Sequence, residues 1–231
     1  MKSLKDMSIL VTGGGSGIGL GTARYCIERG AKVTICGRRE DKIKAAASEL
    51  GDACHGVAAD ITVAADRQKL LGATIDHGGQ LDALVNNAGN MYRGAITELD
   101  ENALQEVFHT NVIAAMMLTG LCAPHLAQRK GAVVFVGSIH TRRAFPGASP
   151  YAATKAAVQG LTRVLAAELG EQKIRVNCLL PGAVFTEINQ RAGLMDDETA
   201  LQRLEGMSDL HALGRIGTTE EIAEAMAYLI C

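Results

Sequence analysis

The 231-residue chain has no tryptophan and only four tyrosines, four phenylalanines and four prolines. Its six cysteines are scattered, with no C-x-x-C pair and no short paired spacing. This pattern is typical of buried or incidental thiols and predicts a reducing, cytoplasmic location. No proline-rich linker, internal repeat or low-complexity tract divides the chain. Residues 1–231 are therefore predicted to form a single domain.

An excess of one charge is also missing. Lysine and arginine number 23 against 25 aspartates and glutamates, which gives a formal net charge of −2. Nucleic acid and anionic membranes therefore have no obvious electrostatic hold, and neither is predicted as a partner. The most apolar long segment, NVIAAMMLTGLCAPHLA, is interrupted by Thr119, Pro124 and His125. It falls short of a clean membrane span and is predicted to be a buried core helix.

Signals for targeting and metal binding are equally sparse. The apolar run in MKSLKDMSILVTGGG is too short for a signal peptide, and we interpret it as a first strand. The six histidines form no H-E-x-x-H or similar ligand spacing, so no catalytic metal is predicted.

Six compact β-branched runs alternate with helix-length stretches rich in alanine and glutamate. In chain order the runs are MSILVTG, KVTICG, CHGVAAD, LDALVNNAG, AVVFVGS and IRVNCLLPG. The alternation predicts an α/β fold, a doubly wound parallel sheet with helices on both faces. Ligands on such sheets bind at the carboxyl ends of the strands.

The first run leads directly into TGGGSGIG, residues 12–19, which precedes a helical pattern. Glycines allow a tight turn and a close approach to a ligand, and the next helix offers free N–H groups and a positive dipole end. Gly13, Gly17 and Gly19 give the spacing G-x-x-x-G-x-G, and Leu20 stands where a P-loop needs lysine. A dinucleotide is expected here, although the motif alone would also suit a plain glycine-rich turn.

The second run ends in CGRRED, where a dinucleotide fold often has an acidic residue for the ribose 2′-hydroxyl. Gly37 leaves room there, and Arg38 supplies charge and a planar donor fork for a 2′-phosphate. This favours NADP(H) over NAD(H). The alternative is that Arg38 and Arg39 are solvated charges, partly neutralised by Glu40 and Asp41.

Tyr151 and Lys155 lie four residues apart in SPYAATKAAVQG, on the same face of a predicted helix. A free tyrosine has a pKa of about 10, and a nearby ammonium favours the phenolate, which brings the phenol closer to a useful acid/base range. Ser138 follows the run AVVFVGS at the predicted ligand crevice, where a hydroxyl can polarise a carbonyl oxygen. Alone, the Tyr151–Lys155 pair would be interpreted as a surface pair; together with Ser138 and the glycine turn it indicates catalysis.

With these residues in place, the sequence resembles the short-chain dehydrogenase/reductase family from about residue 5 to its end. The resemblance rests on TGGGSGIG, NNAG at 86–89, Asn111, Ser138, YAATK and PGAVFT at 181–186. It implies a Rossmann fold and the Asn-Ser-Tyr-Lys catalytic set. Tyr151 would be the acid/base, Lys155 would lower its pKa and hold the nicotinamide ribose, Ser138 would orient the substrate oxygen, and Asn111 would support a water-linked proton relay.

The resemblance also implies which residues contact the cofactor. Asp60 and Ile61 would flank the adenine, three residues after the fourth strand would line the cofactor, and the PGAVFT segment would meet the nicotinamide. With the glycine turn and the arginines, the full set is Gly13, Ser16, Gly17, Ile18, Gly19, Arg38, Arg39, Asp60, Ile61, Asn87, Ala88, Gly89, Tyr151, Lys155, Pro181, Gly182, Val184 and Thr186.

Several of these residues have plainer interpretations. Asn86 and Asn87 suit a strand-end turn, Asn111 suits a buried polar group bonded to helix backbone, and Thr186 suits a helix cap. Two residues past Ser138, His140 is close enough to contact a substrate. Arg142 and Arg143 either attract an anionic substrate or are exposed loop residues.

Three further expectations concern the architecture. Residues 186–210 are predicted to form a lid over the substrate. The sequence ends in EEIAEAMAYLIC, inside an amphipathic helix, whereas family members usually continue through a further strand; the final edge strand is therefore expected to be missing from this chain. The resemblance also implies a homodimer or homotetramer, formed through the helices predicted at 101–128 and 150–170.

The sequence thus predicts an oxidoreductase that transfers hydride between NADP(H) and a small-molecule carbonyl or secondary alcohol. Two alternatives stay open. An NAD(H)-dependent alcohol dehydrogenase of the same family would differ in the role of Arg38. A nucleotide-binding regulatory protein would have kept the fold without catalysis, although it would not need Asn111, Ser138, Tyr151 and Lys155 together.

Overall fold

Six parallel strands form one sheet in the order β3-β2-β1-β4-β5-β6. The structure is a computed structural model that describes residues 3–188, 198–199, 202, 206 and 208–231. The strands are β1 (Ser8–Thr12), β2 (Lys32–Gly37), β3 (Cys54–Ala58), β4 (Ala83–Asn86), β5 (Ala132–Val136) and β6 (Arg175–Leu179). Each lies within one of the six runs predicted from sequence. The predicted α/β doubly wound fold is therefore confirmed.

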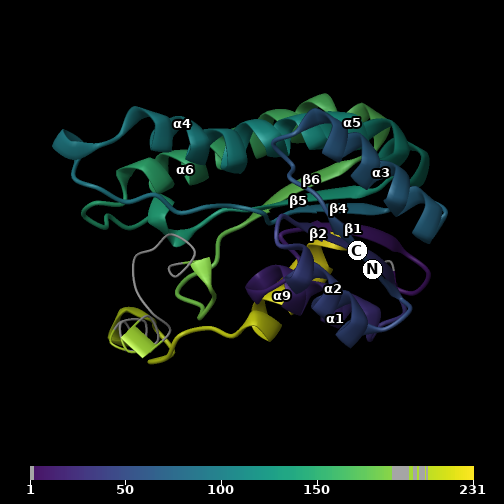
Figure 1. Cartoon of the computed structure of the whole chain (residues 1–231), viewed down its shortest axis with the longest axis horizontal. Helices are drawn as coiled ribbons and strands as arrows, with labels where there is room; N and C mark the ends of the chain where they lie inside the picture. Colours follow the sequence, from purple (N-terminus) through teal and green to yellow (C-terminus); the bar gives the residue numbers. More distant parts are fainter. Residues whose placement is uncertain (1–2, 189–197, 200–201, 203–205, 207) are drawn as a thin grey trace.

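Helices cover both faces of the sheet (Figure 1). One face carries α1 (Gly17–Ile27), α2 (Glu40–Leu50) and α9 (Thr219–Ile230), and the other carries α3 (Ala64–Gly78), α5 (Ala114–Arg129) and α6 (Ser149–Glu168). The helix α4 (Glu101–Phe108) leads into α5 through a π-helical turn, His109–Ile113. Short 3-10 helices lie at Ile96–Glu98, Ile139–Thr141, Gly170–Gln172 and Ser208–Leu210.

Two hydrophobic cores result, one on each side of the sheet. In β1, Ile9 and Val11 pack into the core beneath α1 and α9, while Leu10 packs into the core beneath α3 and α5. Successive side chains of a strand point to opposite faces, so a strand covered on both sides must be apolar throughout. This is why the strands appear in the sequence as continuous apolar runs.

The segment predicted as a core helix is part of a continuous helical stretch, Glu101–Arg129. By length and composition it is apolar enough to cross a membrane, but 56% of its most apolar window is buried inside the structure. Core helices pass the same test, and the burial of Leu118, Cys122 and Leu126 against the sheet accounts for the composition.

The strand order reverses between β1 and β4, which are direct neighbours. Connections leave these two strands toward opposite faces, so a crevice opens at their carboxyl ends. The glycine-rich turn follows β1 and the NNAG segment follows β4, which places both sequence motifs at this crevice.

After residue 188 the structure describes the chain only in separate segments. Of the predicted lid at 186–210, residues 189–197, 200–201, 203–205 and 207 lie outside the described residues. The helix α9 begins with a capping box between Thr218 and Glu221, and the Arg175 guanidinium donates to its last carbonyls, Leu229 and Ile230. Among the described residues, no strand pairs with the outer edge of β6.

Candidate active site and cofactor cleft

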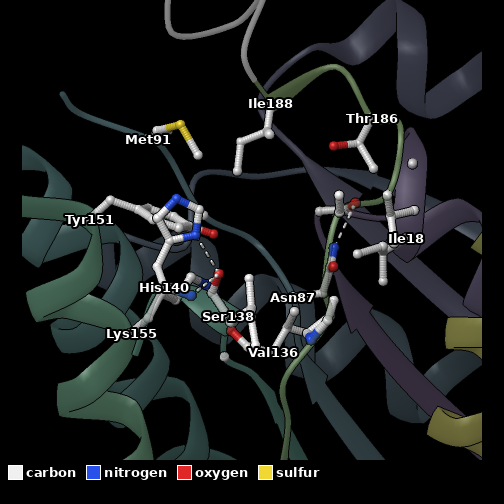
Figure 2. Close-up of a pocket in the computed structure, with 18 of the residues that line it drawn as sticks. Ile18, Asn87, Met91, Val136, Ser138, His140, Tyr151, Lys155, Thr186 and Ile188 are labelled. Atoms are coloured by element: carbon white, nitrogen blue, oxygen red, sulfur yellow. Dashed lines mark hydrogen bonds between the residues drawn. The ribbon is translucent and has the colours of Figure 1, made fainter. Parts of the chain in front are cut away.

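One cavity at the carboxyl ends of β1, β4 and β5 gathers most of the predicted site (Figure 2). It is lined from the glycine turn, the ends of β4 and β5, helix α6 and the segment that follows β6. The predicted residues that line it are Gly13, Ser16, Gly17, Ile18, Asn87, Ala88, Gly89, Ser138, Tyr151, Lys155, Pro181, Gly182, Val184 and Thr186. The cofactor motifs and the catalytic motif therefore share one space.

Thr12 and Asn87 tie the glycine turn to the end of β4. The Thr12 hydroxyl accepts the backbone N–H groups of Asn87 at 3.0 Å and Ala88 at 2.9 Å, and it donates to the Val85 carbonyl at 3.3 Å. The Asn87 amide in return donates to the carbonyls of Thr12 and Gly13. These bonds keep the two strand ends in register at the crevice. Asn87 is thus more than a simple turn former.

The glycines of this turn are required by close packing. A Cβ atom at Gly19 would lie 2.3 Å from the Gly13 carbonyl oxygen, and one at Gly13, where φ is +65°, would lie 2.9 Å from the Ala88 Cα. The backbone can therefore come close to a ligand without side chains in the way. The N-terminus of α1, capped by no side chain, faces this turn and offers N–H groups to an anion. The geometry suits a dinucleotide pyrophosphate.

The two arginines after β2 lie differently. Arg38 is exposed and lines a smaller neighbouring cavity with Gly89 and Ile188. Arg39 pairs with Glu187 at 2.6 Å, and Lys42 lies 3.8 Å from the same carboxylate. The Arg39 guanidinium and a hydrogen bond from Ser16 contribute to holding the pKa of Glu187 below its usual value. Glu187, which the sequence analysis missed, thus joins the start of the predicted lid to the end of β2.

Asp60 and Ile61, expected beside the adenine, follow β3 but are not among the residues that line either cavity. The Asp60 carboxylate accepts the backbone N–H and the hydroxyl of Thr62. Ile61 is buried in the core beneath α3 and α5. Contact of both residues with a cofactor stays a prediction.

Tyr151 and Lys155 are buried one turn apart on α6, with side chains toward the cavity (Figure 2). Burial raises the pKa of Tyr151 to about 12, whereas the sequence analysis expected Lys155 to lower it. The Lys155 ammonium lies 5.5 Å from the Tyr151 ring centroid and donates to the Val136 carbonyl at 2.7 Å. Burial lowers the pKa of Lys155 to about 8. Removal of water is therefore the largest influence on the pKa of each group.

Ser138 is buried at the end of β5, beside Tyr151. A hydrogen bond from Ser138 opposes the rise in the Tyr151 pKa. The Ser138 hydroxyl oxygen also accepts the His140 backbone N–H at 3.3 Å and lies 3.0 Å from Nδ1 of the His140 ring. A hydroxyl, a phenol and an ammonium thus converge at one end of the cavity, as the sequence predicted.

Asn111 lies in the π-helical turn between α4 and α5, outside the cavity lining. Its amide nitrogen donates to the Asn90 carbonyl at 2.9 Å and to Thr154 at 3.0 Å, and its oxygen accepts the Asn90 N–H at 2.8 Å. The side chain therefore links the segment after Gly89 to α6, and its part in a proton relay stays a prediction.

Several residues of the cavity had no clear signal in the sequence. Met91, Arg93, Phe145 and Ile188 also line the cavity. They come from connecting segments, where no periodic pattern marks the residues that face inward. Of the residues near Ser138, His140 lines the cavity, as expected, whereas Arg142 and Arg143 are exposed.

Comparisons with known proteins agree with this arrangement. A family model described as short chain dehydrogenase matches residues 7–197. The chain belongs to the short-chain dehydrogenase family. It is 34% identical to a 3-oxoacyl-[acyl-carrier-protein] reductase of Chlamydia muridarum, over 98% of this chain and 90% of that protein. It is 35% identical to an L-fucose dehydrogenase of Bos taurus, over 96% and 82%.

A solved short-chain dehydrogenase has the same fold. The crystal structure of the 3-ketoacyl-(acyl-carrier-protein) reductase from Brucella melitensis, complexed with NADH, matches with a TM-score of 0.88 at 31% identity. The match covers 99% of this chain and 92% of that one. This short-chain dehydrogenase is accordingly an oxidoreductase with a Rossmann fold that binds NAD(P)(H). Among the described residues, no cluster of three histidine, cysteine or acidic side chains has the geometry of a metal site.

The Thr12 contacts predict a specific loss of stability. Thr12→Val keeps the shape of the side chain but removes the acceptor of the Ala88 N–H and leaves the Asn87 N–H with only its second acceptor, the Val85 carbonyl. We expect the free energy of unfolding to fall by about 2 kcal/mol. Chemical denaturation followed by circular dichroism measures it.

Thr34→Val in β2 is the matched control. Thr34 is as buried as Thr12, but its hydroxyl has no hydrogen-bond partner in the described part of the chain. This variant should be as stable as the wild type or more so. Equal losses in the two variants would show that the Thr12 hydroxyl bonds contribute nothing of their own.

Proposed function

We propose that the protein is an NADP(H)-dependent oxidoreductase that interconverts a carbonyl group and a secondary alcohol, with Tyr151 as the acid/base. The observation that carries this proposal is the convergence of three buried groups, Tyr151, Lys155 and Ser138, on the cavity that the glycine turn also lines. A protein that only senses a nucleotide has no use for a proton-transfer group there.

The chain's own residues manage the proton. NADP(H), when bound, supplies or accepts the hydride. In the reducing direction the Tyr151 hydroxyl gives its proton to the substrate oxygen, and the Ser138 hydroxyl donates a hydrogen bond to that oxygen. The positive charge of Lys155 offsets the negative charge left on the phenol. The buried surroundings strengthen each of these interactions.

The raised pKa of Tyr151 supports the reducing direction. With a pKa of about 12, the side chain is a neutral phenol at pH 7 and holds the proton that a reduction must deliver. Oxidation of an alcohol would instead need the phenolate at the start. Binding of a positively charged oxidised nicotinamide would have to lower that pKa first.

The pKa of Lys155 predicts how reduction depends on pH. Its ammonium is present below pH 8 and is lost as the pH rises through the pKa of about 8. We therefore expect kcat/KM for reduction to be flat from neutral pH to about 8 and then to fall. Initial rates across a pH series measure it. The Lys155→Met variant should have a low kcat/KM at every pH and should lack this fall. A wild-type kcat/KM that rises through pH 8 would contradict the proposed role of the ammonium.

Removal of the Tyr151 hydroxyl tests the mechanism directly. Tyr151→Phe should abolish turnover, because it removes the hydroxyl that is proposed to deliver the proton, and should largely spare cofactor binding. Turnover of a carbonyl panel and fluorescence titration with NADPH measure the two effects. Near-normal turnover by Tyr151→Phe would contradict the proposed mechanism. A wild type that binds NADPH but reduces no compound would favour the regulatory alternative.

The preference for NADP(H) rests on the charges near Ser16 and β2. Arg39 and Lys42 already lie beside one carboxylate, that of Glu187, whose pKa is held below its usual value by Arg39 above all, with smaller contributions from Lys42 and Ser16. We infer that this position suits an anionic group such as the 2′-phosphate, which would have to displace Glu187. Arg38, exposed beside the same crevice, adds a second cation.

Charge variants test the preference for NADPH. Glu187→Gln should tighten NADPH binding roughly threefold, the modest size expected for a half-exposed ion pair, and leave NADH unchanged. Arg38→Asp and Arg39→Asp should weaken NADPH binding selectively. Nicotinamide fluorescence titrations with both cofactors measure these effects. If the ratio of the dissociation constants for NADPH and NADH is unchanged in all three variants, the proposed preference is wrong. The alternative of an NAD(H)-dependent dehydrogenase would then be favoured, consistent with the NADH in the Brucella melitensis structure.

We also propose a homodimer or homotetramer built through α4, α5 and α6. Members of the family commonly form homo-oligomers. Exposed apolar side chains on and beside these elements support the proposal: Ile113 at the end of the π-helical turn, Met116 and Met117 at the start of α5, and Val164 on α6. Their burial against a second copy would remove apolar surface from water.

A further inference from the structure

His140 is placed to control the direction of the Ser138 proton. Figure 2 shows its ring beside Tyr151, with the bond to Ser138 drawn as a dashed line. The ring meets Tyr151 edge to face at a centroid distance of 5.2 Å and packs on Phe145 at 4.5 Å. The sequence marked His140 only as a residue near the substrate. The structure adds a direct bond to a predicted catalytic group.

A serine hydroxyl has one proton to donate and two lone pairs that accept. At Ser138 one lone pair receives the His140 backbone N–H. The second faces Nδ1 of the same residue at 3.0 Å. If Nδ1 carries a proton, both lone pairs are filled, and the only bond left to Ser138 is donation toward Tyr151 and the substrate oxygen. If Nδ1 is bare, it accepts the Ser138 proton and withdraws it from the substrate.

The surroundings keep the ring neutral. Burial, together with the positive charge of Arg93, lowers the pKa of His140 to about 4. A neutral imidazole has one N–H, so the choice of nitrogen decides which way Ser138 points. Donation from Ser138 to the substrate oxygen, which the proposed function requires, needs the Ser138 proton to point away from His140.

We propose that His140 is a positioning residue that donates Nδ1–H to Ser138 and thereby commits the Ser138 proton to the oxygen that Tyr151 protonates. The proposal rests on the proposed function for its effect on turnover. The bond itself is a property of the folded chain and can be measured without a substrate. The neutral ring also packs on Phe145, which fixes the ring plane and the direction of Nδ1.

Nuclear magnetic resonance of ¹⁵N-labelled histidine tests the tautomer directly. The chain has six histidines, and the spectrum of His140→Asn, which lacks one of them, assigns the His140 signals. We expect His140 to be neutral and protonated on Nδ1 at neutral pH. Ser138→Ala should shift it toward the Nε2–H form that free histidine prefers. A His140 ring with a bare Nδ1 in the wild type would overturn the proposal whether or not the protein is an enzyme.

Kinetics test the consequence with matched variants, using 2,3-butanedione and NADPH as the probe pair, or the best compound of a carbonyl panel. His140→Asn retains an N–H donor on the atom that corresponds to Nδ1, whereas His140→Gln moves the donor one bond further and His140→Leu removes it. We expect kcat to fall roughly three- to tenfold in the Leu and Gln variants and to be largely retained in the Asn variant. KM should change little.

A double-variant cycle separates positioning from packing. In a Ser138→Ala background, His140→Leu should lower kcat by less than a further factor of about two, because its effect passes through Ser138. A full additional loss in that background would show that His140 acts through packing or substrate contact and would overturn the proposal. Failure of the proposed function looks different, since Tyr151→Phe would then retain turnover while the His140 tautomer stays as expected.

Discussion

The site depends on one constraint, the exclusion of water from the Tyr151 and Lys155 side chains of α6. Tyr151 and Lys155 are two polar side chains held almost entirely out of solvent, and burial opposes the charged form of each. Each therefore needs a specific partner. The Lys155 ammonium donates to the Val136 carbonyl at the end of β5. Tyr151 interacts with Ser138, which lies two residues beyond the end of the same strand. These two interactions hold α6 against the end of β5.

This arrangement explains why the positions of the predicted catalytic residues could be inferred from the sequence, whereas their pKa values could not. A spacing of four on a helix and a serine at a strand end fix position, because both follow from backbone geometry. The pKa of Tyr151 depends on how much water its neighbours exclude, and those neighbours come from segments far apart in the sequence. Local charge alone suggested a lowered value, whereas burial raises it.

The same division holds for the fold and the cofactor cleft. Continuous β-branched runs and glycine turns predicted all six strands and the position of the crevice. The Arg39–Glu187 pair joins residues 148 positions apart, and Thr12 joins two strand ends 75 residues apart, so no local pattern marks either. Glu187 gives the cleft an internal carboxylate at the place where an external phosphate is proposed. The choice of cofactor would then be coupled, through one anion site, to the first residues of the predicted lid.

The π-helical turn at His109–Ile113 has a consequence for anyone who aligns or redesigns this helix. Each turn of this kind holds one residue more than an α-helical turn, which rotates everything beyond it by about 100°. Val107 on α4 and Ala114 and Leu118 on α5 are nevertheless all buried, at intervals of seven and four residues, which is the spacing of one face of an α-helix. The sequence pattern therefore shows no break at this turn, and a template built as one ideal α-helix from that pattern would place α5 about 100° away from its true rotation.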